Sequence, residues 1–387
     1  MSAVPIDKPK SVGVFSTGLA LFSMFFGAGN LIFPLIVGRM SGTETPFAIV
    51  GLGISAVIFP FLGLIAMMFF GGDIKAFLAR VGVWPAMALL FVLQMGVGPL
   101  GAMPRLVTLM HASIKPYFPN LSIMLFSVAI CVVIFLLTVR PQRMVHLLGV
   151  VLTPLLLLTL AILVVVGSIY APEAQPVFEG SGHHFVQGLK LGYQTTDLIG
   201  ALLFSTVILP HLSQGTGDRR TVWKRMTLAS LIASGLLMAS YIGLCWISAH
   251  HSGAFPDVAP EDLLLCIAVK ILGPFGGFVS SAAVFLACLT TAISLAAVFT
   301  HYLRTEWTKG KMGNTPLLAL TLGVTAAVAN LGFGGIVKFW GPMLEVLYPA
   351  LIVLCLLNIA HSLYRIQLIQ APVFFTLGFA IGNTLTF

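Results

Sequence analysis

The sequence FFGAGNLIFP, residues 25–34, interrupts the first long apolar segment of the chain with two glycines, an asparagine and a proline. Gly27 and Gly29 permit dihedral angles that other residues avoid, and they let neighbouring backbone approach closely. If a helix opens here, the freed N–H and C=O groups can bind a carboxylate, an ammonium group or a small cation. The alternative is a packing notch, in which both glycines admit a neighbouring helix without any break.

The segments around this interruption are too apolar for a soluble protein. Hydrophobic residues make up 58% of the 387 residues, charged residues make up 8%, and the mean hydropathy is +1.04. A bilayer requires that backbone polar groups be satisfied within the protein, which leaves helix bundles and closed barrels. The apolar runs last about 20 residues and lack the alternation of barrel strands. The sequence therefore predicts an all-α, polytopic membrane helix bundle.

Polar and Gly/Pro-rich breaks divide the bundle into eleven predicted spans and leave no soluble domain, so residues 1–387 form one transmembrane domain. These spans lie near residues 12–38, 47–70, 82–111, 119–139, 143–169, 185–212, 224–249, 275–300, 315–330, 341–362 and 370–387. The apolar stretch 256–273 is short and bounded by Pro260 and Pro274, so we expect a hairpin or half-helix there. Function must lie within the bundle.

The basic residues fix a predicted orientation. With a cytoplasmic N-terminus, six of the twenty Lys and Arg residues fall outside, which leaves fourteen inside, as the positive-inside rule requires. Those six are Arg39, Arg105, Lys115, Lys190, Lys270 and Lys338. This distribution explains the net charge of +8 better than a nucleic-acid partner, because the basic residues are scattered over short loops. We expect a multi-pass protein of the cytoplasmic (inner) membrane.

A second break is predicted in the sixth span, where GYQTTD, residues 192–197, places five consecutive hydrogen-bonding side chains in an apolar segment. A carboxylate such as Asp197 is costly inside a membrane, so it should face the interior and meet a cation, an ammonium group or a helix N-terminus. The alternative is that Asp197 caps the helix that follows. Spans one and six run in opposite directions, which is typical of an inverted five-helix repeat with a midplane site. The repeats would be 12–169 and 185–362, with 370–387 peripheral.

A third polar cluster, ACLTT, lies at residues 287–291 in the eighth span. Its hydroxyls could join carbonyls of the first break to hold Na⁺, or they could bond the carbonyls of their own helix. Two further residues have competing interpretations. Glu345 is either an interfacial residue, which we favour, or a proton-coupling carboxylate. Arg105 is expected to snorkel at the outer end of span three, with an outer-gate role as the alternative.

Several motifs resemble the branched-chain amino acid:cation symporter family. They are FGAGNLIFP (26–34), GPLGAMPR (98–105), GYQTTD (192–197), LACLTT (286–291) and LYP (347–349), which together extend over nearly the whole chain. The resemblance implies an inverted repeat of the leucine-transporter type and symport of leucine, isoleucine and valine with Na⁺ or H⁺ by alternating access. Family members usually have twelve spans, whereas eleven are predicted here.

The resemblance also implies site residues. In the eighth span it favours a Na⁺ site over hydroxyls that only bond the carbonyls of their own helix. Na⁺ would be held by the Thr290 and Thr291 hydroxyls and by carbonyls of Ser23, Phe26 and Ala287. The amino acid would lie against the opened segments, whose residues are Gly27, Ala28, Gly29, Asn30, Tyr193, Gln194, Thr195, Thr196 and Asp197.

Other classes of function are less well supported by the sequence. It lacks a P-loop, an HExxH motif and a GxSxG motif, and its five cysteines stand singly. We therefore expect a carrier rather than an enzyme, with a small-molecule substrate, a monovalent cation and the lipid bilayer as partners, and no covalent cofactor. A carrier for another small organic substrate, an intramembrane enzyme and a channel remain alternatives.

Overall fold

The computed structural model describes residues 13–139, 146–177, 180–213 and 218–385, and within these ranges it is helical without a strand. Six stretches in these ranges are long and apolar enough to cross a membrane. They are Ala28–Phe69, Val83–Ile114, Leu147–Ile169, Arg219–Ala254, Pro274–Trp307 and Gly332–Tyr364. Shorter apolar helices accompany them, so the predicted membrane helix bundle is confirmed, while the number of spans stays a prediction.

The helices follow one another with short connections. In chain order they are α1 (Val14–Phe25), α2 (Ala28–Ser41), η1 (Gly42–Glu44), α3 (Thr45–Gly53), η2 (Ile54–Ile58), α4 (Phe59–Phe69), α5 (Ile74–Leu78), η3 (Ala79–Val81), α6 (Val83–Val97), α7 (Ala102–Ile114), α8 (Ile123–Thr138), η4 (Leu147–Leu152), α10 (Thr153–Ile169), α11 (Ser181–Tyr193), α12 (Asp197–Ser213), α13 (Arg219–His251), η5 (Ser252–Ala254), α14 (Leu263–Leu272), α15 (Pro274–Tyr302), η6 (Leu303–Trp307), α16 (Asn314–Ala329), α17 (Gly332–Tyr364) and α18 (Gln370–Leu385). Each predicted span overlaps one or more of them. The predicted half-helix is α14, which packs against α10 and α15.

The third predicted span, 82–111, is not one helix but two, α6 and α7, separated by residues 98–101. A side chain could not replace the glycines of this turn. A Cβ on Gly101 would lie 1.9 Å from the Gly96 carbonyl oxygen, and one on Gly98 would lie 2.5 Å from that of Gln94. Pro99, between them, lacks the N–H that a continuous helix needs. The prediction of one continuous third span is therefore wrong at this turn.

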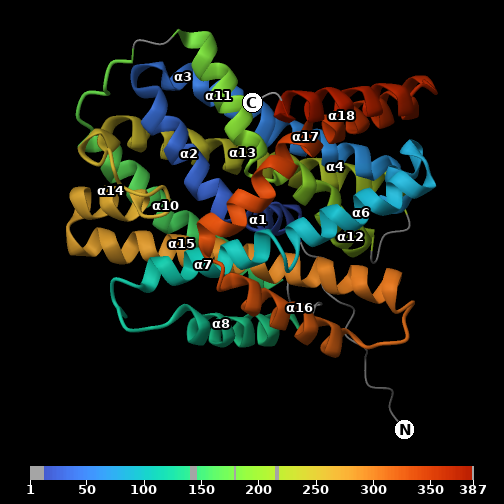
Figure 1. The fold of residues 1–387 in the computed structure, drawn as a ribbon, viewed down its shortest axis with the longest axis horizontal. Coiled ribbons are helices and arrows are strands. Elements are labelled where there is room, and N and C mark those ends of the chain that lie inside the picture. The colour runs from blue at the N-terminus through green and yellow to red at the C-terminus, as the bar shows by residue number, and fades with distance from the viewer. Residues whose placement is uncertain (1–12, 140–145, 178–179, 214–217, 386–387) are drawn as a thin grey trace.

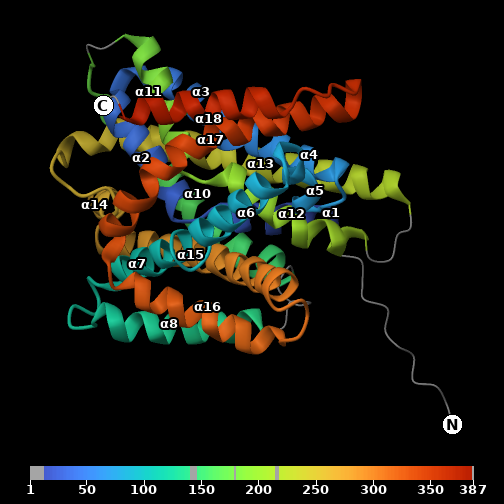
Figure 2. The same ribbon diagram turned by 45° about the vertical axis from the view of Figure 1, so that its right-hand side comes forward.

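The broken helices occupy the middle of the bundle. Figures 1 and 2 show α8 and α16 side by side along one edge, and α18 against α17 along the opposite edge. Between these edges, α1 packs against α13 and α15, while α2 packs against α13 and α11. The core is apolar and includes the fully buried Phe22, Phe26 and Tyr241. The longest helices therefore surround the segments that lose regular backbone.

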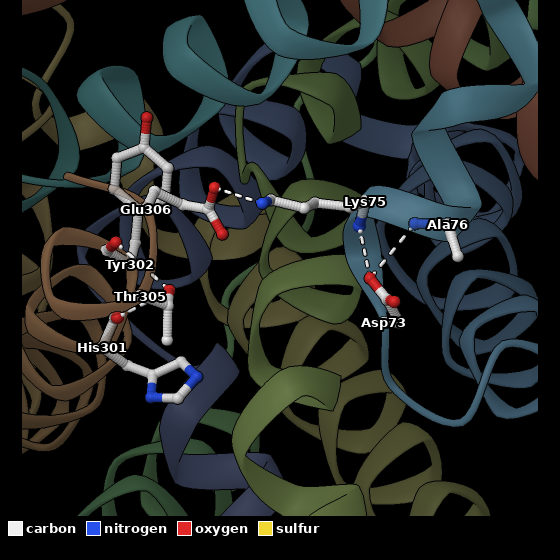
Figure 3. Close-up of polar contacts among 7 residues, drawn as sticks. All are labelled: Asp73, Lys75, Ala76, His301, Tyr302, Thr305 and Glu306. Carbon is white, nitrogen blue, oxygen red and sulfur yellow. Dashed lines mark hydrogen bonds and ion pairs between the residues drawn. The ribbon is translucent and has the colours of Figure 1, made fainter. Parts of the chain in front are cut away.

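A short helix and the end of a long one are joined by an ion pair. Asp73 accepts a hydrogen bond from the backbone N–H of Lys75 (2.9 Å) and so begins α5. The Lys75 side chain forms an ion pair with Glu306 of η6, the turn that extends α15 (Figure 3). Two segments more than two hundred positions apart in the chain are thereby linked at one end of the bundle.

Candidate functional site

The first predicted break is present. α1 ends at Phe25 and α2 begins at Ala28, and Gly27 between them is extended, with φ −118° and ψ −154°. The Gly27 N–H donates to Oδ1 of Asn30 (3.1 Å), so a side chain replaces a helical partner. The glycines also let another backbone segment approach closely, as the packing-notch interpretation expects. A Cβ on Gly29 would lie 3.1 Å from the Cα of Thr195.

The second predicted break is also present, between α11 and α12. Thr196 has a left-handed φ of +65°, a conformation that costs a β-branched residue about 1–2 kcal/mol. The Thr196 carbonyl accepts the N–H of Gly200 (2.9 Å), so Thr196 stands at the cap position and Asp197 is the first helical residue. The alternative in which Asp197 caps the helix is therefore wrong.

Asp197 joins the two breaks through a buried polar cluster. Nδ2 of Asn30 donates to Oδ1 (2.8 Å) and Oδ2 (2.7 Å) of Asp197, and the Tyr241 hydroxyl donates to Oδ2 (2.7 Å). The Asn30 amide also donates to the Tyr241 hydroxyl. Asp197 is only 2% exposed and stands at the positive end of the α12 dipole, which favours its negative charge. It faces the interior as predicted.

Tyr241 was missed by the sequence analysis. It lies within the regular helix α13 and carries no local signal of a break, because a lone tyrosine in an apolar helix is usually a core residue. Its ring is fully buried and stacks on Phe26, with ring centroids 6.5 Å apart. Only its position opposite the two breaks makes it part of the site.

A small cavity lies where the breaks meet. It offers about 40 Å³ to water-sized molecules and is lined by both opened segments together with apolar walls. The lining residues are Met24, Phe25, Gly27, Ala28, Gly29, Asn30, Val97, Ala102, Arg105, Leu106, Thr195, Thr196, Asp197, Gly200, Phe204, Thr291 and Leu295. Seven of the nine predicted substrate residues are in this set. The apolar walls, which the sequence did not name, come mainly from α1, α7, α12 and α15.

The other two predicted substrate residues lie beside the cavity rather than on its wall. The Tyr193 ring stacks on Tyr348, with centroids 4.9 Å apart. Nε2 of Gln194 donates to Oε1 of Glu345 (3.3 Å), and Glu345 is exposed. Both contacts tie the end of α11 to α17. The interfacial position of Glu345 stays a prediction.

The predicted cation residues are buried and come from α15 and the α1 break. The Thr291 hydroxyl donates to the Ser23 carbonyl (3.2 Å), so these two groups meet across helices. The Thr290 hydroxyl instead donates to the Ala287 carbonyl of its own helix (3.0 Å), as in the alternative interpretation. Phe26 is the C-cap residue that follows α1. Among the residues that the structure describes, His, Cys, Asp and Glu do not form a group of three or more that could hold a metal.

Arg105 does not snorkel to an outer surface. It lies in the first turn of α7, is 5% exposed and belongs to the wall of the cavity. The expected snorkelling position of Arg105 is therefore wrong. The turn at 98–101 starts a new helix at Ala102, and in this helix Arg105 points inward. The guanidinium lies over the rings of Phe33 (6.0 Å) and Phe333 (5.5 Å).

Comparison with known proteins identifies similar sequences along the whole chain. A family described as branched-chain amino acid transport protein matches residues 10–387. The branched-chain amino acid transport system 3 carrier protein of Pseudomonas aeruginosa is 30% identical over 387 residues, covering 97% of this chain and 87% of the relative. The branched-chain amino acid permease BrnQ of Escherichia coli K12 is 28% identical, covering 96% of this chain and 86% of the permease.

Solved structures of two transporters share the fold. One is Mhp1, a nucleobase-cation-symport-1 family transporter in a closed conformation with bromovinylhydantoin bound (TM-score 0.60, 13% identity, 98% of this chain and 94% of that chain covered). The other is a Na⁺-coupled sialic acid symporter in a substrate-bound outward-open state (TM-score 0.56, 13% identity, 92% and 82% covered). The predicted fold of the leucine-transporter type is confirmed.

Proposed function

Because the chain belongs to the branched-chain amino acid transport protein family, we propose that it carries leucine, isoleucine and valine by symport with Na⁺ or H⁺. The protein is a multi-pass membrane transporter and not an enzyme. The observation that carries the proposal is the meeting of two broken helices around Asp197, beside a cavity with apolar walls. Such a cavity suits an amino acid, since the opened backbone can bind its charged groups and the walls its side chain.

The substrate would occupy the cavity between the opened segments. The Asp197 carboxylate and the carbonyls near Gly27 would face its ammonium group, and Leu106, Phe204 and Leu295 would contact its branched side chain. The present cavity of about 40 Å³ is much smaller than the roughly 150 Å³ of a protein cavity that holds a benzene molecule. An amino acid must therefore enter a wider conformation, as alternating access requires.

Cation coupling would use the contact between α1 and α15. Carbonyl and hydroxyl oxygens of hard character, such as those of Ser23 and Thr291, are suitable ligands for Na⁺. Phe26, Ala287 and Thr290 would complete the set. A Cβ on Gly27 would lie 3.0 Å from Oγ1 of Thr291, so the cation residues touch the segment that binds substrate. Occupancy of one site would then change the affinity of the other.

The proposed architecture divides the bundle into repeats 12–169 and 185–362, each beginning with a broken helix, with 370–387 peripheral. The distribution of Lys and Arg supports a cytoplasmic N-terminus in the inner membrane.

Uptake of labelled leucine into proteoliposomes tests the proposal. A Na⁺ or H⁺ gradient should drive leucine accumulation above its equilibrium level, and unlabelled isoleucine and valine should compete. Equal uptake with and without both gradients would reject symport. Uptake that does not saturate would indicate a channel, and competition by unrelated amino acids alone would indicate a different substrate.

A further inference from the structure

Arg105 places a buried positive charge on the wall of the cavity. Its side chain is 5% exposed, and its Nε is buried without a hydrogen-bond partner. Throughout the described ranges, neither an ion pair nor a hydrogen bond joins the guanidinium to another residue. A buried charge is costly unless it is paired, so an arrangement of this kind calls for an anion that the chain itself does not supply.

The surroundings of the guanidinium hold it in place but compensate its charge only in part. The rings of Phe33 and Phe333 lie 6.0 and 5.5 Å from it, at distances where aromatic faces attract a cation. Neither ring accepts the planar set of N–H donors that an arginine presents. Those donors stay available to a ligand in the cavity.

The backbone that carries Arg105 is fixed by the turn before α7. The Arg105 N–H donates to the Gly101 carbonyl (3.3 Å), and the Trp340 indole donates to the Leu100 carbonyl (2.8 Å). The second contact anchors the turn to α17. A guanidinium on an anchored first turn is oriented before a ligand arrives, which reduces the entropy lost on binding.

The cavity also contains a carboxylate, but Asp197 is already engaged. Its oxygens accept hydrogen bonds from Asn30 and Tyr241 rather than from Arg105. The cavity therefore presents one group suited to an ammonium and a separate group suited to a carboxylate. An amino acid is a zwitterion with both charges, and arginine binds a carboxylate through two parallel hydrogen bonds.

We propose that Arg105 binds the α-carboxylate of the transported amino acid and thereby makes the carboxylate a condition of recognition. This inference rests on the proposed function and adds one residue to its site. In a purely structural role, by contrast, the Arg105 side chain would contribute only its packing between Phe33 and Phe333.

Leucine and leucinamide distinguish these roles, because leucinamide keeps the ammonium group and the side chain but lacks the carboxylate. Binding of both would be measured on the purified full-length protein in detergent, with Na⁺ present. The wild type should bind leucine about thirtyfold or more tightly than leucinamide, as expected for a buried charge pair. Arg105→Gln should lose most of that preference while leucinamide affinity stays within about threefold. Arg105→Lys should be intermediate, since it keeps the charge without the fork.

Arg39→Gln is the matched control. Arg39 lies in α2, is partly buried and donates to the Val258 carbonyl (2.8 Å) outside the cavity, so this variant should keep the full preference for leucine. A wild type that binds leucine and leucinamide equally would overturn the inference even if Arg105→Gln failed to fold. A folded Arg105→Gln variant that still prefers leucine would also overturn the inference, but it would not contradict the proposed function. A wild type that binds neither compound would overturn both.

Discussion

Asp197 is the residue on which the two breaks converge, since it accepts hydrogen bonds from Asn30 of α2 and Tyr241 of α13. Its first position in α12 adds the favourable field of a helix N-terminus. A buried carboxylate with these donors retains its charge at lower cost than an isolated one. The same charge would attract the ammonium group of a substrate.

Asp197→Asn should reduce leucine uptake by about tenfold or more at every cation concentration. The substitution removes the negative charge, and a hydrogen bond to a charged group is worth about 1.5–3 kcal/mol. Tyr241→Phe is the milder companion, because it removes one donor and keeps the charge. Proteoliposome uptake across a series of Na⁺ concentrations is the measurement. Normal uptake by Asp197→Asn, with normal protein yield, would contradict the assignment.

Thr291→Ala should raise the Na⁺ concentration needed for half-maximal uptake more than Thr290→Ala does. The Thr291 hydroxyl meets Ser23 of α1, whereas Thr290 bonds within its own helix. Both variants should leave the order of preference among leucine, isoleucine and valine unchanged. Thr300→Ala, also in α15, is the control, because its buried hydroxyl is without a hydrogen-bond partner in the part of the chain that the structure describes. Unchanged Na⁺ dependence in Thr290→Ala and Thr291→Ala would remove the cation site from this position.

At the scale of elements, the breaks in α1–α2 and α11–α12 pack directly on each other. Gly29 lies against the backbone of Thr195, which leaves no room for a methyl group without movement of a backbone segment. The α6–α7 turn adds a third irregular segment next to the cavity. Each opened segment exposes polar backbone where it lines a cavity, the setting in which a membrane tolerates it.

Gly29→Ala should therefore lower both thermal stability and leucine affinity. Its Cβ would lie 3.1 Å from the Thr195 Cα and 3.3 Å from the Gln194 carbonyl oxygen. Overpacking of this kind typically costs about 1–3 kcal/mol. Gly235→Ala in α13 is the control, since a Cβ there meets nothing within 4 Å. Thermal unfolding in detergent, followed by leucine binding, would check both variants, and equal behaviour of the two would refute the packing argument.

The ion pair between Lys75 and Glu306 should have a small and salt-sensitive effect. The side chains are 57% and 26% exposed, and pairs of this kind contribute about 0.2–1 kcal/mol. Lys75→Ala and Glu306→Ala should each change the uptake rate by less than about fivefold, and the double variant should resemble either single one. The uptake rates of the wild type, the two single variants and the double variant would be measured at low and high salt. Fully additive effects would show that the two residues act independently.

For the whole molecule, the central cavity of about 40 Å³ must widen to admit an amino acid. The pair α8 and α16 at one edge packs on α15, and α18 packs on α17 at the other edge (Figure 1). Movement of the central broken helices against such outer helices would open the cavity. Substrate and cation would then select among conformations in proportion to their differential affinity.

Leucine together with Na⁺ should stabilise the whole bundle against thermal unfolding. A ligand present at about one hundred times its Kd stabilises the folded state by about 2.7 kcal/mol. The unfolding midpoint of the protein in detergent should rise with leucine in Na⁺ and rise less with leucine in K⁺. Alanine at the same concentration is the control for apolar fit. A midpoint that moves equally for all three conditions would argue against coupled binding.

Local chemistry made the fold predictable from sequence. Runs of apolar residues predict helices in a bilayer, and Gly-rich interruptions predict where backbone opens, so the positions of the two main breaks and the burial of Asp197 were predicted correctly. The tenth predicted span begins near residue 341, whereas α17 is helical from Gly332. The same reasoning also treated 82–111 as continuous, because a turn inside an apolar segment leaves the hydropathy unchanged.

Only the tertiary structure decided which residues meet. Asn30 and Asp197 are 167 positions apart and Asn30 and Tyr241 are 211 apart, and sequence spacing carries no information on such pairs. The inward position of Arg105 and the apolar walls of the cavity likewise depend on how helices pack. The sequence by itself determined a membrane bundle with opened helices, because hydropathy and backbone freedom are local properties. The contacts that make a binding site are set by packing between distant helices, and these exist only in the folded chain.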